Sequence, residues 1–240
     1  MKLNAKIRVA TSTLLFLLAI VGIQCSRPAE NPIATSAIEP PTLSSASRGD
    51  VVPYAVGFPD LTVDTDKLSR SLQIVSRNLK ATDCPVVEGC SIPGKRKLMR
   101  FDVATPNYGT ADLIVVRPQD HPELFVYSPC HGHYHYIDFS AYRLRNASGV
   151  ILTGRKQAFC LMDVSRYTQG ASSQGYNCSN QGISVGWADV YDKGLDCQWL
   201  DVTDVPAGNY TLEVEINLNG VFNEGLNVYP NLVQVPVTIR

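Results

Sequence analysis

Short β-type runs separated by turn residues fill the sequence beyond residue 100 and limit what the chain can fold into. The runs are rich in β-branched, aromatic and leucine residues, and they cover 113–116, 139–144, 150–152 and 210–216. Such runs indicate antiparallel strands joined by turns. The turn cluster 146–149 lies between two of them and predicts a hairpin over 142–153. We therefore expect a mostly β fold, a single antiparallel β-sandwich-like domain with long irregular loops and disulfides.

Two segments depart from this pattern. In 66–80 the apolar residues fit a helical stripe, although the neighbouring residues look extended, so periodicity leaves helix and strand both open. The polar stretch between Cys160 and Trp187 predicts a long irregular loop. Loops of this length in a compact domain tend to be functional or mobile.

The N-terminus has the composition of an export signal. Basic residues precede a largely apolar run over 9–23, which predicts a signal peptide over residues 1–25 and leaves an uncleaved membrane anchor as the alternative. Cys25 directly after the run leaves a lipid anchor open, although Gln24 is bulky where such sites prefer a small residue. Residues 26–57, rich in Pro, Ser and Ala, predict a disordered linker, and 58–240 is long enough for one domain.

Cysteine content and charge narrow the location and the partners. Setting aside Cys25, six of the seven cysteines remain, an even number suited to disulfides in an oxidising compartment. We expect a secreted or extracytoplasmic protein, periplasmic or at the cell surface if bacterial. The formal charge of -1 and the lack of a long Lys/Arg block argue against a nucleic-acid partner, since the densest basic patch, 95–97, is short.

Three of the four histidines lie within five residues, at His131, His133 and His135. In a strand these positions share one face, and imidazole is the commonest side-chain ligand for zinc, copper and non-haem iron. A flat strand would hold the outer two Cα atoms roughly 13 Å apart, too far for one ion. The chain must therefore twist or bend, and Gly132 makes that easier. The alternative is three exposed strand histidines without a metal.

Several motifs in one order resemble the catalytic domain of the lysyl oxidases. They are the histidine string, 156–163, 189–191 and 196–199, preceded by 59–61, Cys84, Cys90, 98–101 and 109–113, and followed by 201–210. The resemblance covers nearly the whole expected domain, and motifs at family-like spacing are far more specific than three histidines alone.

The resemblance implies a copper amine oxidase. His131, His133 and His135 would bind copper, and Lys156 and Tyr191 would become the family's cofactor, lysine tyrosylquinone. Only a tyrosine supplies the ring that copper and dioxygen oxidise to a quinone, and only a lysine supplies a long amine that adds to it. Such an enzyme converts primary amines, peptidyl-lysine among them, to aldehydes with O2 and releases ammonia and hydrogen peroxide.

The catalytic base does not carry over from the resemblance. The family's histidine upstream of the copper motif corresponds to Ser128 here, and another family histidine falls within 140–142, which reads Ser-Ala-Tyr. Asp138, three residues beyond the last histidine, is our candidate for the base or for a residue that orients a ligand ring. A surface turn residue is the alternative reading.

The resemblance also implies disulfides and a second cation. It supports Cys84–Cys90 and Cys130–Cys178, which leaves Cys160 and Cys197 to pair, because Arg166 and Trp187 replace the family cysteines expected to partner them. Some family members hold a structural calcium. The residues in comparable regions are Asp60, Leu61, Glu224, Asn227 and Asn231.

Two other functions compete with the oxidase. A non-catalytic extracellular copper-binding β-domain would keep the fold and lack turnover. A zinc hydrolase with three histidines and a water would leave the matches at Lys156 and Tyr191 unexplained.

Overall fold

The computed structural model describes residues 57–154 and 160–240. The predicted signal peptide, all of the predicted linker except Gly57, and Lys156 lie outside these ranges. Within them, no helix is long and apolar enough to cross a membrane.

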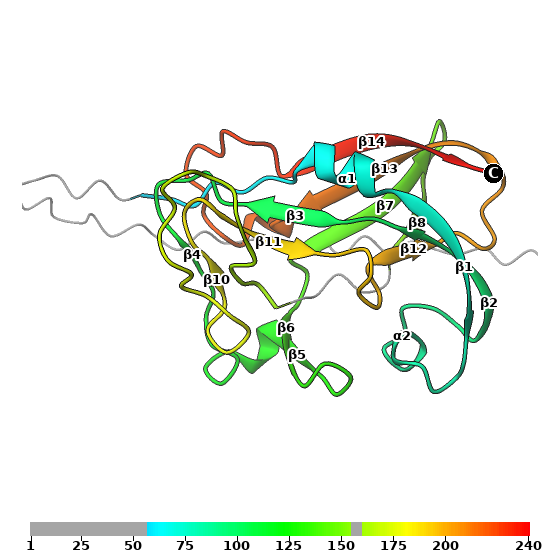
Figure 1. Ribbon diagram of the computed structural model, residues 1–240, viewed down its shortest axis with the longest axis horizontal. Coiled ribbons are helices and arrows are strands. Elements are labelled where there is room, and N and C mark those ends of the chain that lie inside the picture. Colours follow the sequence, from blue (N-terminus) through cyan, green and yellow to red (C-terminus); the bar gives the residue numbers. More distant parts are fainter. Residues whose placement is uncertain (1–56, 155–159) are drawn as a thin grey trace, which may run out of the picture. The chain divides into compact units, whose positions relative to one another are not determined.

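The described residues form several antiparallel sheets and little helix, which confirms the predicted mostly β fold (Figure 1). The four-stranded sheet has the order β14-β13-β7-β8, two sheets of three have the orders β1-β2-β12 and β3-β11-β9, and β4 pairs with β10 and β5 with β6. The strands are β1 (Gln73–Leu79), β2 (Gly94–Arg100), β3 (Val103–Pro106), β4 (Leu113–Ile114), β5 (Phe125–Ser128), β6 (His133–Tyr136), β7 (Ser140–Asn146), β8 (Gly149–Thr153), β9 (Ser165–Arg166), β10 (Gly182–Ile183), β11 (Trp187–Tyr191), β12 (Trp199–Asp201), β13 (Gly208–Ile216) and β14 (Leu232–Ile239). The helices are α1 (Thr65–Ser71), α2 (Cys84–Val87) and two 3-10 turns, η1 (Pro122–Leu124) and η2 (Leu218–Gly220).

One hydrophobic core joins the four-stranded sheet to the sheet of β3 and β11. Its members include Val103, Tyr142, Leu144, Tyr191, Leu212, Val214 and Ile216. Residues at alternate positions of β13 and β7 point into it, as expected for strands with one buried face. The hairpin predicted over 142–153 is present, because β7 and β8 pair from Asn146 opposite Gly149.

The ambiguous segment 66–80 contains both a helix and a strand. Asp64 caps α1 by accepting a hydrogen bond from the Lys67 backbone N–H at 2.8 Å, and Leu68 packs in the core. From Gln73 onward the chain pairs with β2 along its whole length. Pairing with a neighbouring strand therefore overrides the helical stripe in the second half of the segment.

The long loop between Cys160 and Trp187 is organised by one buried carboxylate. Asp163 is fully buried and accepts hydrogen bonds from the backbone N–H groups of Gly175, Tyr176 and Ser184 at 2.8, 3.2 and 2.8 Å. The Ser184 hydroxyl donates to the same carboxylate at 2.7 Å. The loop is irregular, but its backbone is held at fixed points.

The structure corrects the expected disulfides. Cys84–Cys90, Cys130–Cys178 and Cys160–Cys197 are absent from the described residues, which instead contain Cys84–Cys130, Cys90–Cys197 and Cys160–Cys178 with Cα separations of 5.9, 5.5 and 5.3 Å. The cause is the compact turn around α2. It directs one cysteine toward the histidine hairpin and the other toward the segment before β12.

Arg166 and Trp187, the positions that lack the family cysteines, lie opposite each other in β9 and β11. The Arg166 guanidinium lies 5.2 Å from the centre of the Trp187 ring. Cys160 and Cys197 therefore keep partners in other cysteines, and Arg166 and Trp187 form a cation–π contact of about 0.5–1 kcal/mol with each other.

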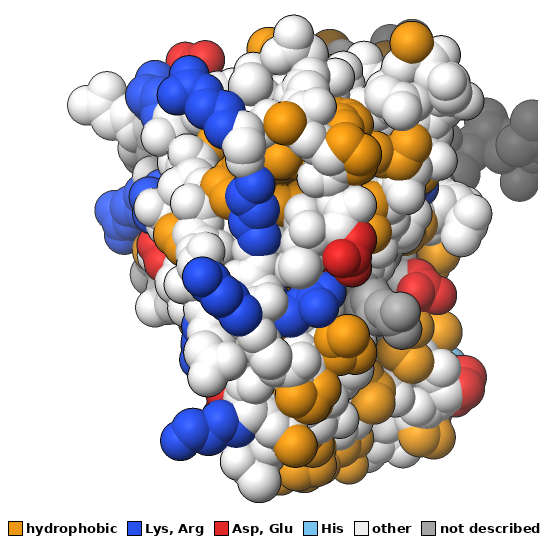
Figure 2. Space-filling model, turned by 90° about the vertical axis from the view of Figure 1, so that its right-hand side faces the viewer, with side chains coloured by type: hydrophobic (Ala, Val, Ile, Leu, Met, Phe, Trp, Pro, Cys, Tyr) orange, Lys and Arg blue, Asp and Glu red, His pale blue; other side chains and the backbone are white. Residues whose placement is uncertain are grey.

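The short basic patch 95–97 lies within β2 and is partly neutralised. Arg96 forms an ion pair with Asp201, and Figure 2 shows Lys and Arg side chains interspersed with hydrophobic and uncharged ones on the face that it displays. In that view they form no continuous basic surface.

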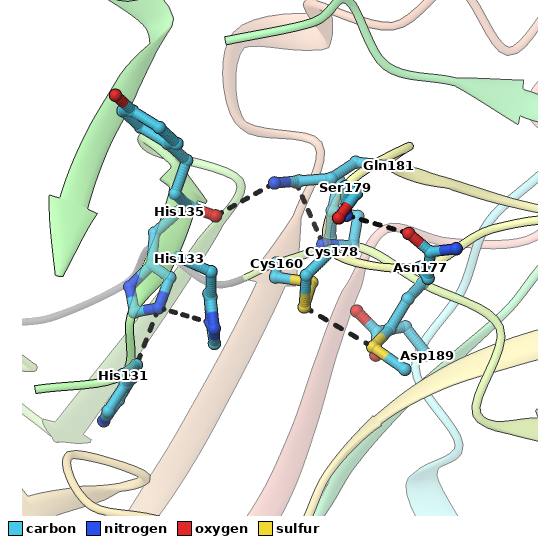
Figure 3. The surroundings of a disulfide bond; sticks show 12 residues. His131, His133, His135, Cys160, Asn177, Cys178, Ser179, Gln181 and Asp189 are labelled. Carbon is cyan, nitrogen blue, oxygen red and sulfur yellow. Dashed lines mark hydrogen bonds between the residues drawn. A yellow bond between two sulfur atoms is a disulfide. The ribbon is translucent and has the colours of Figure 1, made fainter.

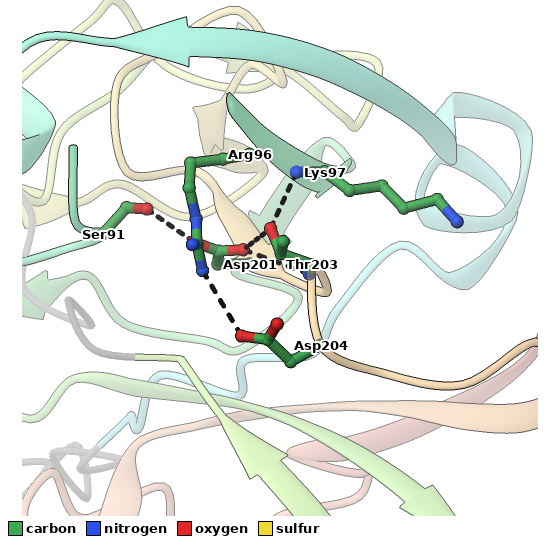
Figure 4. A network of polar contacts seen from close by, with 6 residues as sticks. All are labelled: Ser91, Arg96, Lys97, Asp201, Thr203 and Asp204. Atoms are coloured by element: carbon green, nitrogen blue, oxygen red, sulfur yellow. Dashed lines mark hydrogen bonds and ion pairs between the residues drawn. The ribbon is translucent and has the colours of Figure 1, made fainter. Parts of the chain in front are cut away.

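Asp201 is the centre of a polar network that joins β2 to β12 (Figure 4). The Arg96 Nε donates to its carboxylate at 2.8 Å, and the hydroxyls of Ser91 and Thr203 donate as well. Burial alone would raise the pKa of Asp201, but these hydrogen bonds outweigh it and lower the pKa.

Substitution Asp201→Asn should lower the free energy of unfolding at neutral pH by about 2 kcal/mol, because the charged acceptor of several hydrogen bonds is lost. Since the folded-state pKa lies below the unfolded value, the stabilisation is complete above the unfolded pKa of about 3.9 and is lost as the pH falls through the folded one. Urea denaturation of both proteins from neutral pH to about pH 3 measures this.

Asp204→Asn is the matched control. Asp204 lies 3.8 Å from the Arg96 guanidinium with its side chain 91% exposed, so its substitution should change stability by less than about 0.5 kcal/mol. Equal effects of the two substitutions would contradict the role given to Asp201.

Candidate metal centre

The three histidines are brought together by a bend at Gly132 between β5 and β6. The backbone N–H groups of His131 and Gly132 both donate to the Ser128 carbonyl, at 3.2 and 2.8 Å, and Gly132 has a φ of +72°. His131 therefore precedes the strand, while His133 and His135 lie within β6. The bend removes the geometric objection to a site made from one flat strand.

The ring nitrogens converge on one point. The Nε2 of His135 lies 3.3 Å from the Nδ1 of His131 and 3.0 Å from the Nε2 of His133. A metal binds imidazole nitrogens at about 2.0–2.1 Å. Two such nitrogens at a right angle or a tetrahedral angle around one ion lie about 2.9–3.4 Å from each other. The donor set therefore fits one ion of a metal that favours imidazole, such as copper or zinc.

The histidines form one wall of a cavity of about 220 Å³. The other described residues that line it include Cys160, Met162, Cys178, Asp189, Tyr191 and Asp196. The cavity thus brings a potential metal site together with buried groups of β11 and with the start of the loop that Asp163 organises.

Asp189 and Tyr191 are two residues apart on β11, so both side chains point to the same face of the strand. The Tyr191 hydroxyl donates to the Asp189 carboxylate and lies 3.4 Å from the Cys160 carbonyl oxygen. Burial raises the pKa of Asp189 to about 7 and, together with the neighbouring carboxylate, raises that of Tyr191 well above its usual value. Near neutral pH the Tyr191 hydroxyl therefore keeps its proton, whereas the Asp189 carboxyl can gain or lose one.

Sequence reasoning missed Asp189 as a functional residue. The spacing of an acid and a tyrosine at i and i+2 in a β-type run was the available signal, since strand geometry places both on one face. Asp138, the expected candidate, is exposed at a φ of +56° and is not among the described residues that line the cavity.

Gln181 links the histidine hairpin to the loop behind the cavity (Figure 3). Its amide Nε2 donates to the carbonyl of Tyr134 at 2.9 Å, between two of the histidines, and its Oε1 accepts from the Leu161 backbone N–H at 3.1 Å. The side chain is buried. Gln181 therefore fixes the distance between the potential metal ligands and the cysteine wall.

The residues expected to bind calcium also lie together. The Asp60 carboxylate accepts from the backbone N–H groups of Val228 and Tyr229, and that of Glu224 accepts from the Leu61 backbone N–H and the Asn231 amide. The Asn227 backbone N–H donates to the Glu224 carbonyl. Both carboxylates accept N–H groups here, so calcium binding at this place stays a prediction.

Comparison with known proteins identifies the family. A model of the family described as lysyl oxidase matches residues 59–235. The chain is 38% identical over 174 residues to lysyl oxidase homolog 3B of Danio rerio and 33% identical over 175 residues to lysyl oxidase homolog 2 of Homo sapiens. Each match covers 67% of this chain but only 21% and 22% of the relative, so the chain spans about a fifth of their length. The chain belongs to the lysyl oxidase family.

Proposed function

We propose that the domain is a copper-dependent amine oxidase that converts primary amines, including lysine side chains of proteins, to aldehydes with O2, releasing ammonia and hydrogen peroxide. The observation that carries the proposal is the shared cavity, with three histidines on one wall and the hydrogen-bonded pair of Asp189 and Tyr191 on another. A metal-binding module alone would not need a buried phenol beside the histidines.

The histidines and the Asp189–Tyr191 pair each have a task in this proposal, together with Lys156. His131, His133 and His135 would hold copper, which with O2 supplies the oxidation that turns Tyr191 and Lys156 into lysine tyrosylquinone. Asp189 accepts the proton of the Tyr191 hydroxyl when the ring is oxidised. The same carboxylate, with a pKa of about 7, is suited to remove a proton from the α-carbon of the amine during turnover.

Chain length is compatible with the crosslink between Lys156 and Tyr191. Lys156 is four residues before Cys160, whose carbonyl lies 3.4 Å from the Tyr191 hydroxyl. Four residues span at most about 14 Å, and the lysine side chain adds to that reach.

The remaining proposals concern the setting. Three disulfides in the described residues favour an oxidising, secreted or extracytoplasmic location. Calcium at Asp60 and Glu224 would join the segment before α1 to the segment before β14. A zinc hydrolase would need neither Asp189 nor Tyr191, so we favour the oxidase over the hydrolase.

Loading the protein with copper in the presence of O2 should join Lys156 to Tyr191 covalently. Peptide mapping should recover the two residues in one crosslinked peptide that is trapped by a hydrazine. Tyr191→Phe should abolish the product, whereas Tyr142→Phe, which changes a buried tyrosine whose hydroxyl bonds Gln198 at 3.3 Å, should keep it. Separate unmodified peptides after copper and O2 would show a copper-binding domain without turnover.

Asp189→Asn should lower kcat/KM for a primary amine by about 100-fold or more, the usual contribution of a general base. Because the carboxylate form is required, wild-type kcat/KM should rise with pH and level off above about 7. Asp138→Asn, at the exposed turn, is the control and should keep kcat/KM within about twofold. If Asp138→Asn causes the larger loss, the base is Asp138.

A further inference from the structure

The disulfide Cys160–Cys178 forms part of the cavity wall opposite the histidines (Figure 3). Its two sulfur atoms and a ring nitrogen of His133 all lie within 4.8 Å of one another. The bridge is thus close enough to the histidines for its sulfurs and one of the proposed copper ligands to reach the same ion.

A third sulfur atom faces the same place. The thioether sulfur of Met162 lies 3.7 Å from the Cys178 sulfur, and Met162 also lines the cavity. Thiolates and thioethers are soft ligands that select Cu(I), whereas a disulfide is a poor ligand for any of these metals. The two cysteine sulfurs therefore become soft ligands only when the bridge is open, and the Met162 thioether lies beside them.

We propose that reduction of Cys160–Cys178 creates a second copper site, specific for Cu(I) and made by Cys160, Cys178 and His133 with Met162 at its edge. A dithiol reductant supplies two electrons and two protons. The sulfur–sulfur bond breaks, the reductant becomes a disulfide, and two cysteine thiols form. Cu(I) then binds the thiolates and displaces their protons to solvent.

The surrounding structure keeps the sulfurs together after the bridge opens. Asp163 holds both arms of the loop, since it accepts from Gly175 and Tyr176 just before Cys178 and lies three residues after Cys160. Gln181 ties the same segment to Leu161. These hydrogen bonds do not depend on the disulfide, so both thiols stay at the cavity.

The other two bridges lack this chemistry in the described residues. Cys90–Cys197 has the carboxylate of Glu88 as its neighbouring ligand group, a hard oxygen donor that does not favour Cu(I). Cys84–Cys130 is in none of the clusters of potential ligands found there. This contrast provides the control for a test.

The proposal shares His133 with the proposed oxidase site but requires no oxidase activity. The protein is reduced anaerobically with a dithiol, which is then removed. The opened cysteines are mapped by alkylation of a separate sample, and Cu(I) affinity is measured by competition with bicinchoninate. Reduced wild-type protein should bind Cu(I) at least tenfold more tightly than the disulfide form, and X-ray absorption should show sulfur neighbours. A protein that fails to form the Lys156–Tyr191 crosslink can still pass this test.

Three variants test whether the effect arises at this bridge. The double variant Cys160→Ser, Cys178→Ser keeps the three histidines and should lose the gain in affinity, whereas Cys90→Ser, Cys197→Ser, which leaves the Cys84–Cys130 tie to the histidine hairpin in place, should retain it. The single variant Cys160→Ser has a free Cys178 thiol without any reductant. It should bind Cu(I) at least tenfold more tightly than the double variant Cys160→Ser, Cys178→Ser. The proposal would be overturned if the single variant and this double variant bound Cu(I) equally tightly. It would also be overturned if X-ray absorption showed only nitrogen neighbours around copper in the reduced wild type.

Discussion

The buried carboxylate of Asp163 is the interaction on which the arrangement of the cavity depends. It accepts three backbone N–H groups and one hydroxyl from residues 12 to 21 positions away. Without Asp163, the backbone N–H of the buried Ser184 would lose its partner, at a cost of about 1–3 kcal/mol. Because one carboxylate binds the backbone at both 175–176 and 184, it ties this part of the loop to the segment of Cys160 and Met162, which line the cavity.

Gln181 connects this loop to the histidine hairpin by hydrogen bonds. Its amide bridges the Leu161 backbone and the carbonyl of Tyr134, so the loop and the histidine hairpin share one buried side chain. On the opposite side, β11 pairs with β3 and presents Asp189 and Tyr191 from the edge of the core. The cavity is therefore built where a loop, a hairpin and a core strand meet, and each contributes a different chemical group.

Features that depend on local sequence pattern could be predicted. Short β-type runs predicted the antiparallel sheets, the turn cluster 146–149 predicted the β7–β8 hairpin, and the histidine spacing with Gly132 predicted a bend that brings the three histidine rings together. Cysteine pairing did not follow from sequence, because it depends on which distant segments the α2 turn faces. The split of 66–80 into helix and strand depends on pairing with β2, and the raised pKa of Asp189 depends on burial, neither of which is visible along the chain.

The histidine hairpin is held by contacts outside its own two strands. β5 and β6 form a sheet of only two strands, which is marginally stable by itself in water. Cys130, directly before His131, is tied to Cys84, and the Ile137 backbone N–H donates to Leu124 at the other end at 2.9 Å. Closing a loop with a sequence separation of 46 lowers the entropy of the unfolded chain and so favours the folded hairpin. The convergence of three ring nitrogens thus rests on restraints outside the hairpin, so a change at Cys84 or Gln181 should loosen the metal site without touching a ligand.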